Sequence, residues 1–160
     1  MQITTKEILW NQFGASIDML ENALIMCPVE SWDTKNKFWY NAFHCLFFLD
    51  YYLTVNPLDF SPPEPFTVSE FEDKMPDRVY NKNELLSYLK LSRKKCQDLI
   101  LGLTDGIANQ RWTNYSGNMN YSVLELLVYN LRHVQHHAAQ LNFILRQDID
   151  AAPNWVSRAR

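Results

Sequence analysis

Three of the four histidines in the chain lie close together near its C-terminal end, at His133, His136 and His137. His133 and His137 are four residues apart, and on a helix this spacing places two side chains one turn apart on the same face. Two imidazoles in that arrangement can bind one divalent metal ion from the same side. The spacing alone leaves two interpretations open, a metal site or two histidines hydrogen-bonded within an ordinary core.

The apolar pattern around these histidines predicts a helix over residues 123–147. Its main apolar face contains Leu127, Leu131, Val134, Leu141 and Leu145. At about 100° per residue, His133, His137 and Gln140 lie beside this face, whereas His136 lies on the far side among charged residues. The pattern therefore predicts that the pair four residues apart points inward and that His136 points outward.

The fourth histidine, His44, lies in the middle of a second predicted helix, residues 34–54. Aromatic and aliphatic residues surround nearly the whole of this helix, as expected for a central, buried helix. Three neutral imidazoles would be difficult to satisfy in one core without a metal. We therefore predict that His44, His133 and His137 bind one divalent ion. Three imidazoles around Zn²⁺ or Ni²⁺ leave positions for water or substrate, as in catalytic sites.

Other catalytic patterns are missing from the sequence. It contains no Glu-x-x-His motif for a ferritin-like di-iron site and no His-Glu-x-x-His motif for a metalloprotease. Cys45 follows His44, but adjacent helical side chains diverge by about 100°, so we interpret this cysteine as a small buried residue. Tyr40, Phe48 and Tyr51 share the side of His44 and are candidates to line a pocket.

The bulk composition restricts the class of protein. A length of 160 residues, 47% of them hydrophobic, predicts one folded domain over residues 1–160. The net charge of −3 is scattered, so we expect no nucleic-acid partner. No apolar run approaches the roughly 20 residues that span a bilayer, and no export signal begins the chain. Together with three separated cysteines, these features predict a cytoplasmic protein with no membrane partner.

Four long helices are predicted, over residues 5–26, 34–54, 83–102 and 123–147, with long connections after the second and the third. Prolines between residues 55 and 68 exclude a regular element there, and we expect the 57–65 part to be a crossover or a lid. We interpret Arg93-Lys94-Lys95 as a solvated face, residues 104–120 as a polar loop, and Trp155 as an anchor for the tail. The fold class is therefore all-α, a four-helix bundle.

Two stretches of this bundle resemble the DinB-like superfamily. They are Asn41-Ala42-Phe43-His44-Cys45-Leu46 and the late helix that reads His133-x-x-x-His137-x-x-Gln140-Leu141. Members of this superfamily are four-helix bundles with a three-histidine metal site. The resemblance implies that His44, His133 and His137 are the ligands, and that Gln140 occupies a polar position after the last of them. It extends over most of the chain in helix order and loop placement.

The resemblance also carries functional expectations. Relatives include metal-dependent transferases of low-molecular-weight thiols, such as bacillithiol S-transferases, and mycothiol-dependent isomerases. It thus implies an enzyme that acts on small molecules, with a thiol S-transferase as the first hypothesis. It also implies a homodimer formed through exposed helical faces, for which the outward Phe143 is a candidate contact. Two alternatives stay open, a hydrolase with the same ligands and a non-catalytic metal-binding or stress-related bundle.

Overall fold

The computed structural model describes residues 3–160. Met1 and Gln2, on which part of the expectation about an export signal rests, lie outside the described residues. The long helices are α1 (Ile3–Met26), α3 (Phe38–Tyr52), α4 (Lys82–Gly102) and α6 (Val123–Ile149). The short elements are α2 (Val29–Trp32), η1 (Pro57–Asp59), η2 (Ser69–Glu72), α5 (Asp105–Asn109), β1 (Arg111–Thr113) and β2 (Asn120–Ser122).

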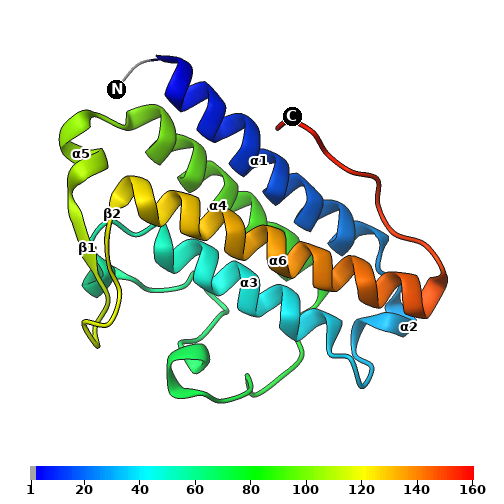
Figure 1. Cartoon of the computed structure of the whole chain (residues 1–160). Coiled ribbons are helices and arrows are strands. Elements are labelled where there is room, and N and C mark those ends of the chain that lie inside the picture. The colour runs from blue at the N-terminus through cyan, green and yellow to red at the C-terminus, as the bar shows by residue number, and fades with distance from the viewer. Residues whose placement is uncertain (1–2) are drawn as a thin grey trace.

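The four long helices form one bundle, in which α1 and α3 each pack against both α4 and α6 (Figure 1). The apolar stripe of each helix is buried in this way, so the predicted all-α bundle is confirmed. The helix bounds differ from the prediction chiefly at α3, which begins four residues later, after the short helix α2. None of the described helices is long and apolar enough to cross a membrane.

α3 is buried along most of its length, and Cys45 is among its fully buried residues. It is not central as predicted, because it packs against α4 and α6 in the same way as α1 does. α3 also carries Asp50, whose side chain is only 9% exposed. Lys95 Nζ donates to Asp50 Oδ1 at 2.6 Å, and the Tyr88 hydroxyl donates to Asp50 Oδ2 at 3.0 Å. Since burial of an unpaired carboxylate is strongly unfavourable, these two donors from α4 are what allow Asp50 to occupy the core.

The basic run Arg93-Lys94-Lys95 is not a simple solvated face, as the sequence suggested. Arg93 pairs with Asp18, a buried residue of α1, and Lys95 pairs with Asp50. Only Lys94 forms an exposed pair, with Asp98 one turn further along α4. The prediction was wrong because it treated the run as one surface, whereas successive helical residues point in different directions.

The polar loop predicted for residues 104–120 contains a helix and a hairpin. Thr104 Oγ1 accepts from the Ile107 N–H at the start of α5, and β1 pairs with β2 in antiparallel register. Trp112 faces Tyr121 across the hairpin, and its indole N–H donates to the Thr54 carbonyl at 2.9 Å. The hairpin thereby fastens the end of α3. Strands of three residues are too short to show the alternation by which strands are predicted.

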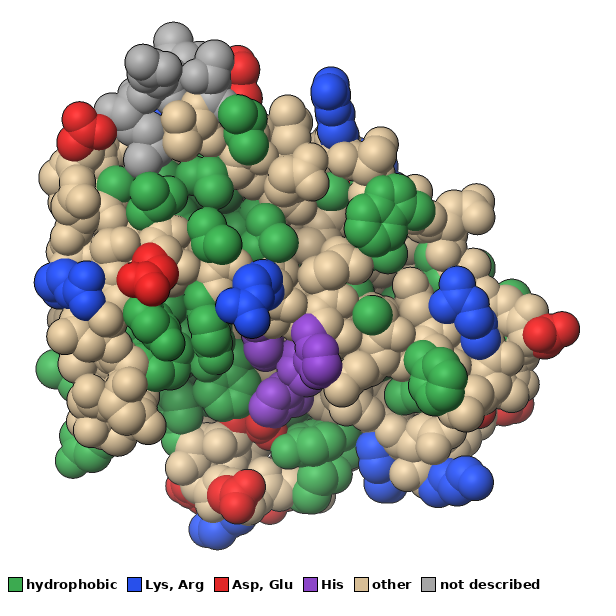
Figure 2. Space-filling view, viewed as in Figure 1, with side chains coloured by type: hydrophobic (Ala, Val, Ile, Leu, Met, Phe, Trp, Pro, Cys, Tyr) green, Lys and Arg blue, Asp and Glu red, His purple; other side chains and the backbone are tan. Residues whose placement is uncertain are grey.

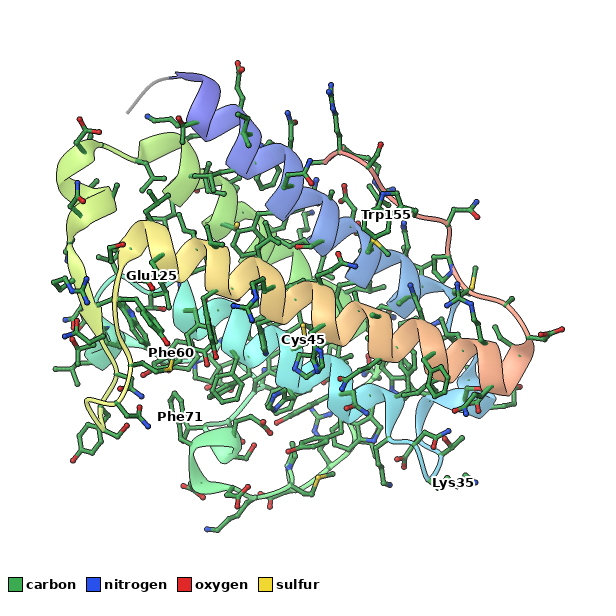
Figure 3. The ribbon with its side chains drawn as sticks, in the orientation of Figure 1. Lys35, Cys45, Phe60, Phe71, Glu125 and Trp155 are labelled. Atoms are coloured by element: carbon green, nitrogen blue, oxygen red, sulfur yellow. The ribbon has the colours of Figure 1, made fainter. Side chains whose placement is uncertain are left out.

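The connection between α3 and α4 packs its aromatic side chains against α3. Phe60 and Phe71 both stack edge-on against Phe47, with ring centroids 5.1 Å and 4.9 Å away (Figure 3). Two short 3₁₀ turns form within it, so the expectation of no regular element was wrong over Pro57–Asp59, where Pro57 begins a turn capped by Asn56. This packing holds η2 next to α3.

The C-terminal tail runs back along α1 (Figure 1). Trp155 does not anchor it, because this side chain is 70% exposed. The Ala159 N–H instead donates to the Asn11 carbonyl at 3.0 Å, and the Arg160 N–H donates to Asp18 Oδ2 at 2.9 Å. At Gly14 a Cβ would stand 2.5 Å from the Ala159 Cβ, so only glycine permits this close approach.

We expect Asp50→Ala to lower the free energy of unfolding by about 2 kcal/mol or more, because Lys95 and Tyr88 lose a shared buried acceptor. Urea unfolding measures this change. Asp98→Ala is the matched control, since its pair with Lys94 is exposed and is worth at most about 1 kcal/mol. Equal losses in the two variants would contradict a stabilising role of the buried network.

Candidate metal centre

The three histidines singled out in the sequence meet between α3 and α6. One ring nitrogen from each of His44, His133 and His137 lies within 4.8 Å of the other two. The ring centroids of His133 and His137 are 4.6 Å apart, as expected for one turn of α6, and His44 lies 4.9 Å from His137. Figure 2 shows the histidines together on one face of the molecule, beside an apolar area.

Three ring nitrogens of this cluster lack a partner among the described residues. Both nitrogens of His133 and Nδ1 of His137 are buried without a hydrogen bond to any residue that the structure describes. Burial, together with the neighbouring imidazoles, lowers the pKa of His133 to about 3 and that of His137 to about 4. Both rings are therefore neutral at pH 7, the form that binds metals. The cluster could bind one divalent metal ion.

Glu70, from the turn η2, completes the surroundings of His44. Its Oε2 lies 2.5 Å from Nδ1 of His44, and its side chain is only 3% exposed. Burial raises the pKa of the nearby Tyr40 to about 12, and the Glu70 carboxylate contributes to this shift. The sequence analysis missed Glu70, because no spacing rule links a turn in a long connection to a helix residue 26 positions earlier. The one available signal was an acidic residue next to Phe71, shortly after the 57–65 segment that was expected to be a crossover or a lid.

His136 and Gln140 lie at the edge of the cluster. His136 is exposed, as the helical pattern predicts, and it does not belong to the group of three that could hold a metal. The Gln140 amide donates to Nε2 of His136 at 3.1 Å, and Gln140 also partly opposes the lowering of the His137 pKa. Gln140 thus links the outward histidine to the inward one.

Aromatic side chains surround the cluster on the α3 side. The Phe48 ring centroid lies 4.9 Å from that of His44, and the Tyr40 centroid lies 6.5 Å from it, as expected from their shared side of the helix. Tyr51 instead packs against Trp112 and Phe71, away from the histidines. Its neighbour Tyr52 takes the place next to His133, at 5.8 Å.

An open groove of about 580 Å³ follows α6 and reaches His133. Tyr129, Arg132 and His136 contribute to its lining. Its wall is mainly apolar, and Arg132 is its one permanently charged side chain. Grooves of about 300–1,000 Å³ suit small molecules, so the cluster has a neighbouring space in which such a ligand fits.

A family model described as the DinB superfamily matches residues 12–141 of the chain. The chain belongs to the DinB superfamily. The matched region contains His44, His133 and His137 as well as Glu70. Searches of curated proteins and of solved structures found no match. Membership is consistent with the observed bundle and with a three-histidine metal site, but it does not select one reaction.

We expect the metal-free protein to lose stability as the pH falls below about 6.5, the ordinary histidine pKa. The pKa values of His133 and His137 are depressed in the folded state, so the unfolded chain binds more protons between about pH 4 and 6.5. Urea unfolding with a chelator between pH 5.5 and 7.5 measures this slope. His133→Gln should flatten it, whereas the control His136→Gln should not. An unchanged slope in His133→Gln would contradict the buried neutral ring.

Proposed function

We propose that this protein is a metal-dependent enzyme in which His44, His133 and His137 bind one zinc or nickel ion. The observation that carries the proposal is a cluster of imidazoles whose buried nitrogens have no partner among the described residues. Buried polar atoms in native proteins are nearly always paired, and a shared cation satisfies all three rings at once. Three neutral ligands also leave coordination positions for a substrate, which favours a catalytic site over a structural one.

The reaction that we propose is the transfer of a small thiol to an electrophile. A bound divalent ion lowers the pKa of a thiol, so that the reactive thiolate is available at neutral pH. The sulfur then bonds to the electrophilic carbon, the leaving group departs with its electron pair, and the thiol proton passes to solvent. The groove along α6 receives the two reactants. Phe48 and Tyr52 shield one side of the histidines from water, and Tyr129 offers an aromatic surface to the substrate.

The position of Glu70 supports transfer over hydrolysis. A hydrolase with the same ligands needs a general base within hydrogen-bond reach of the attacking water. Glu70 is the carboxylate that contacts the histidines, but its Oε2 is engaged with Nδ1 of His44. A thiol needs no such base once its pKa is lowered. The experiments below distinguish this enzyme from the alternative, a bundle that binds metal without catalysis.

Metal content is the first test of this proposal. Protein purified without a histidine tag should contain about one zinc or nickel ion per chain by mass spectrometry, and His44→Ala should lose it, because two imidazoles hold an ion less tightly than three. The control His136→Ala removes an exposed histidine of the same helix and should keep the metal. Absence of metal from the wild type, even after supplementation, would refute the site.

Thiol transfer is the second test. We expect wild-type protein to accelerate the reaction of bacillithiol, or another small thiol, with a chromogenic aryl halide, and chelation to abolish this acceleration. His133→Ala should lower the metal-dependent rate at least about 100-fold, since loss of a ligand disturbs both the affinity and the geometry of the ion. His136→Ala is again the control. Bound metal without any thiol- or ester-directed activity would favour the non-catalytic alternative.

A further inference from the structure

We propose that Glu70 is a positioning residue. It holds His44 so that one ring nitrogen points toward His133 and His137. In this way it also couples metal binding to the docking of the connection between α3 and α4. This inference rests on the metal site of the proposed function. Its experiment separates the failure of the positioning role from the failure of the site itself.

The burial of Glu70 is the first observation. Its neighbours Glu72 and Asp73 are exposed, as expected for charged residues of a surface turn, whereas the Glu70 side chain is 3% exposed. Among the residues that the structure describes, no lysine or arginine pairs with it, and its one ion-pair contact is His44. A carboxylate is buried in this way only when a specific partner requires it.

Docking of the connection does not by itself explain this burial. Oε1 of Glu70 and the hydroxyl of Ser69 are buried without a hydrogen bond to any described residue. A half-satisfied buried carboxylate is a poor stabiliser compared with an apolar side chain of similar size. Phe60 and Phe71 already bury apolar surface against Phe47 of α3. We infer that Glu70 is placed for its effect on His44 rather than for the stability of the turn.

The contact selects one tautomer of His44. An ionised carboxylate only accepts hydrogen bonds, so Nδ1 must donate its proton to Oε2 across the 2.5 Å contact. The lone pair that can bind a metal is then on Nε2. The ring is held between Glu70 and Phe48, which lies 4.9 Å away, and it faces His137 at the same centroid distance. Carboxylates that contact a metal-binding histidine in this way fix the ring and raise its basicity.

The same contact couples two parts of the molecule. Glu70 reaches Nδ1 only when η2 is packed against α3, so docking of the turn favours the ring orientation that binds metal. By reciprocity, a cation on Nε2 polarises the Nδ1–H group and strengthens its hydrogen bond to Glu70, so metal binding favours the docked turn. His133 and His137 are both on the rigid helix α6, so His44 is the ligand through which this coupling acts.

Zinc affinity is the direct test. Competition with a fluorescent zinc chelator should give Glu70→Gln a Kd about 10–100-fold weaker than that of the wild type, the usual effect of removing such a carboxylate. Glu72→Gln is the matched control, because it removes an exposed carboxylate two residues further on, and it should bind zinc like the wild type. Glu70→Asp keeps the charge on a shorter side chain and should recover part of the affinity.

Hydrogen exchange of the connection is the second readout. Zinc should slow amide exchange within residues 60–80 of the wild type and of Glu72→Gln, but not of Glu70→Gln. Equal zinc affinity in Glu70→Gln and the wild type would overturn the positioning role, even if the metal-free variant melted at a lower temperature. A wild type that binds no metal would instead refute the proposed function. If Glu70→Gln does not fold, Glu70→Asp decides by the same comparisons.

Discussion

The contact between α3 and α6 is the constraint on which the rest of the molecule depends. Both helices turn imidazoles toward this contact, and three of their ring nitrogens, both of His133 and Nδ1 of His137, have no partner among the described residues. Such a group of polar atoms destabilises an apolar core unless a cation or another ligand satisfies it. Contacts from the neighbouring elements satisfy the buried polar groups of α3 and cover its surface. Lys95 and Tyr88 satisfy its buried Asp50, Trp112 binds its last turn, and aromatic side chains of the following connection cover its outer side.

Two features of the site could be predicted from the sequence because they are local. The spacing of His133 and His137 places both rings on one face of a helix, and the apolar period of that helix distinguishes them from His136. His44 could be added without a spacing rule, since it was the remaining histidine and lay on the most apolar of the predicted helices. The third step of the prediction was that α3 packs against α6, which is a normal contact between helices of a bundle.

Most of the features that the sequence analysis missed are contacts between residues far apart in the chain. No helical or strand periodicity relates such residues to each other. Glu70 meets His44 across 26 positions, Lys95 meets Asp50 across 45, and Arg160 meets Asp18 across 142. Lys95 and Arg160 look solvent-exposed in the sequence but reach buried aspartates, and Glu70 is itself buried. Burial of this kind depends on how distant segments dock. The hairpin was missed for a different reason, because its strands are shorter than the period that reveals strands.

The proposed site combines two histidines from one helix with a third from another. His133 and His137 are both on α6, whereas His44 on α3 contacts Glu70 from a turn in the connection, to which we attribute its orientation. The open groove approaches the cluster along α6, whereas Glu70 contacts His44 from the connection. Glu70 is not part of the groove lining, which includes His133 but neither His44 nor His137. If the histidines bind a metal as we propose, a small molecule in the groove would lie beside His133 without displacing the carboxylate that contacts His44.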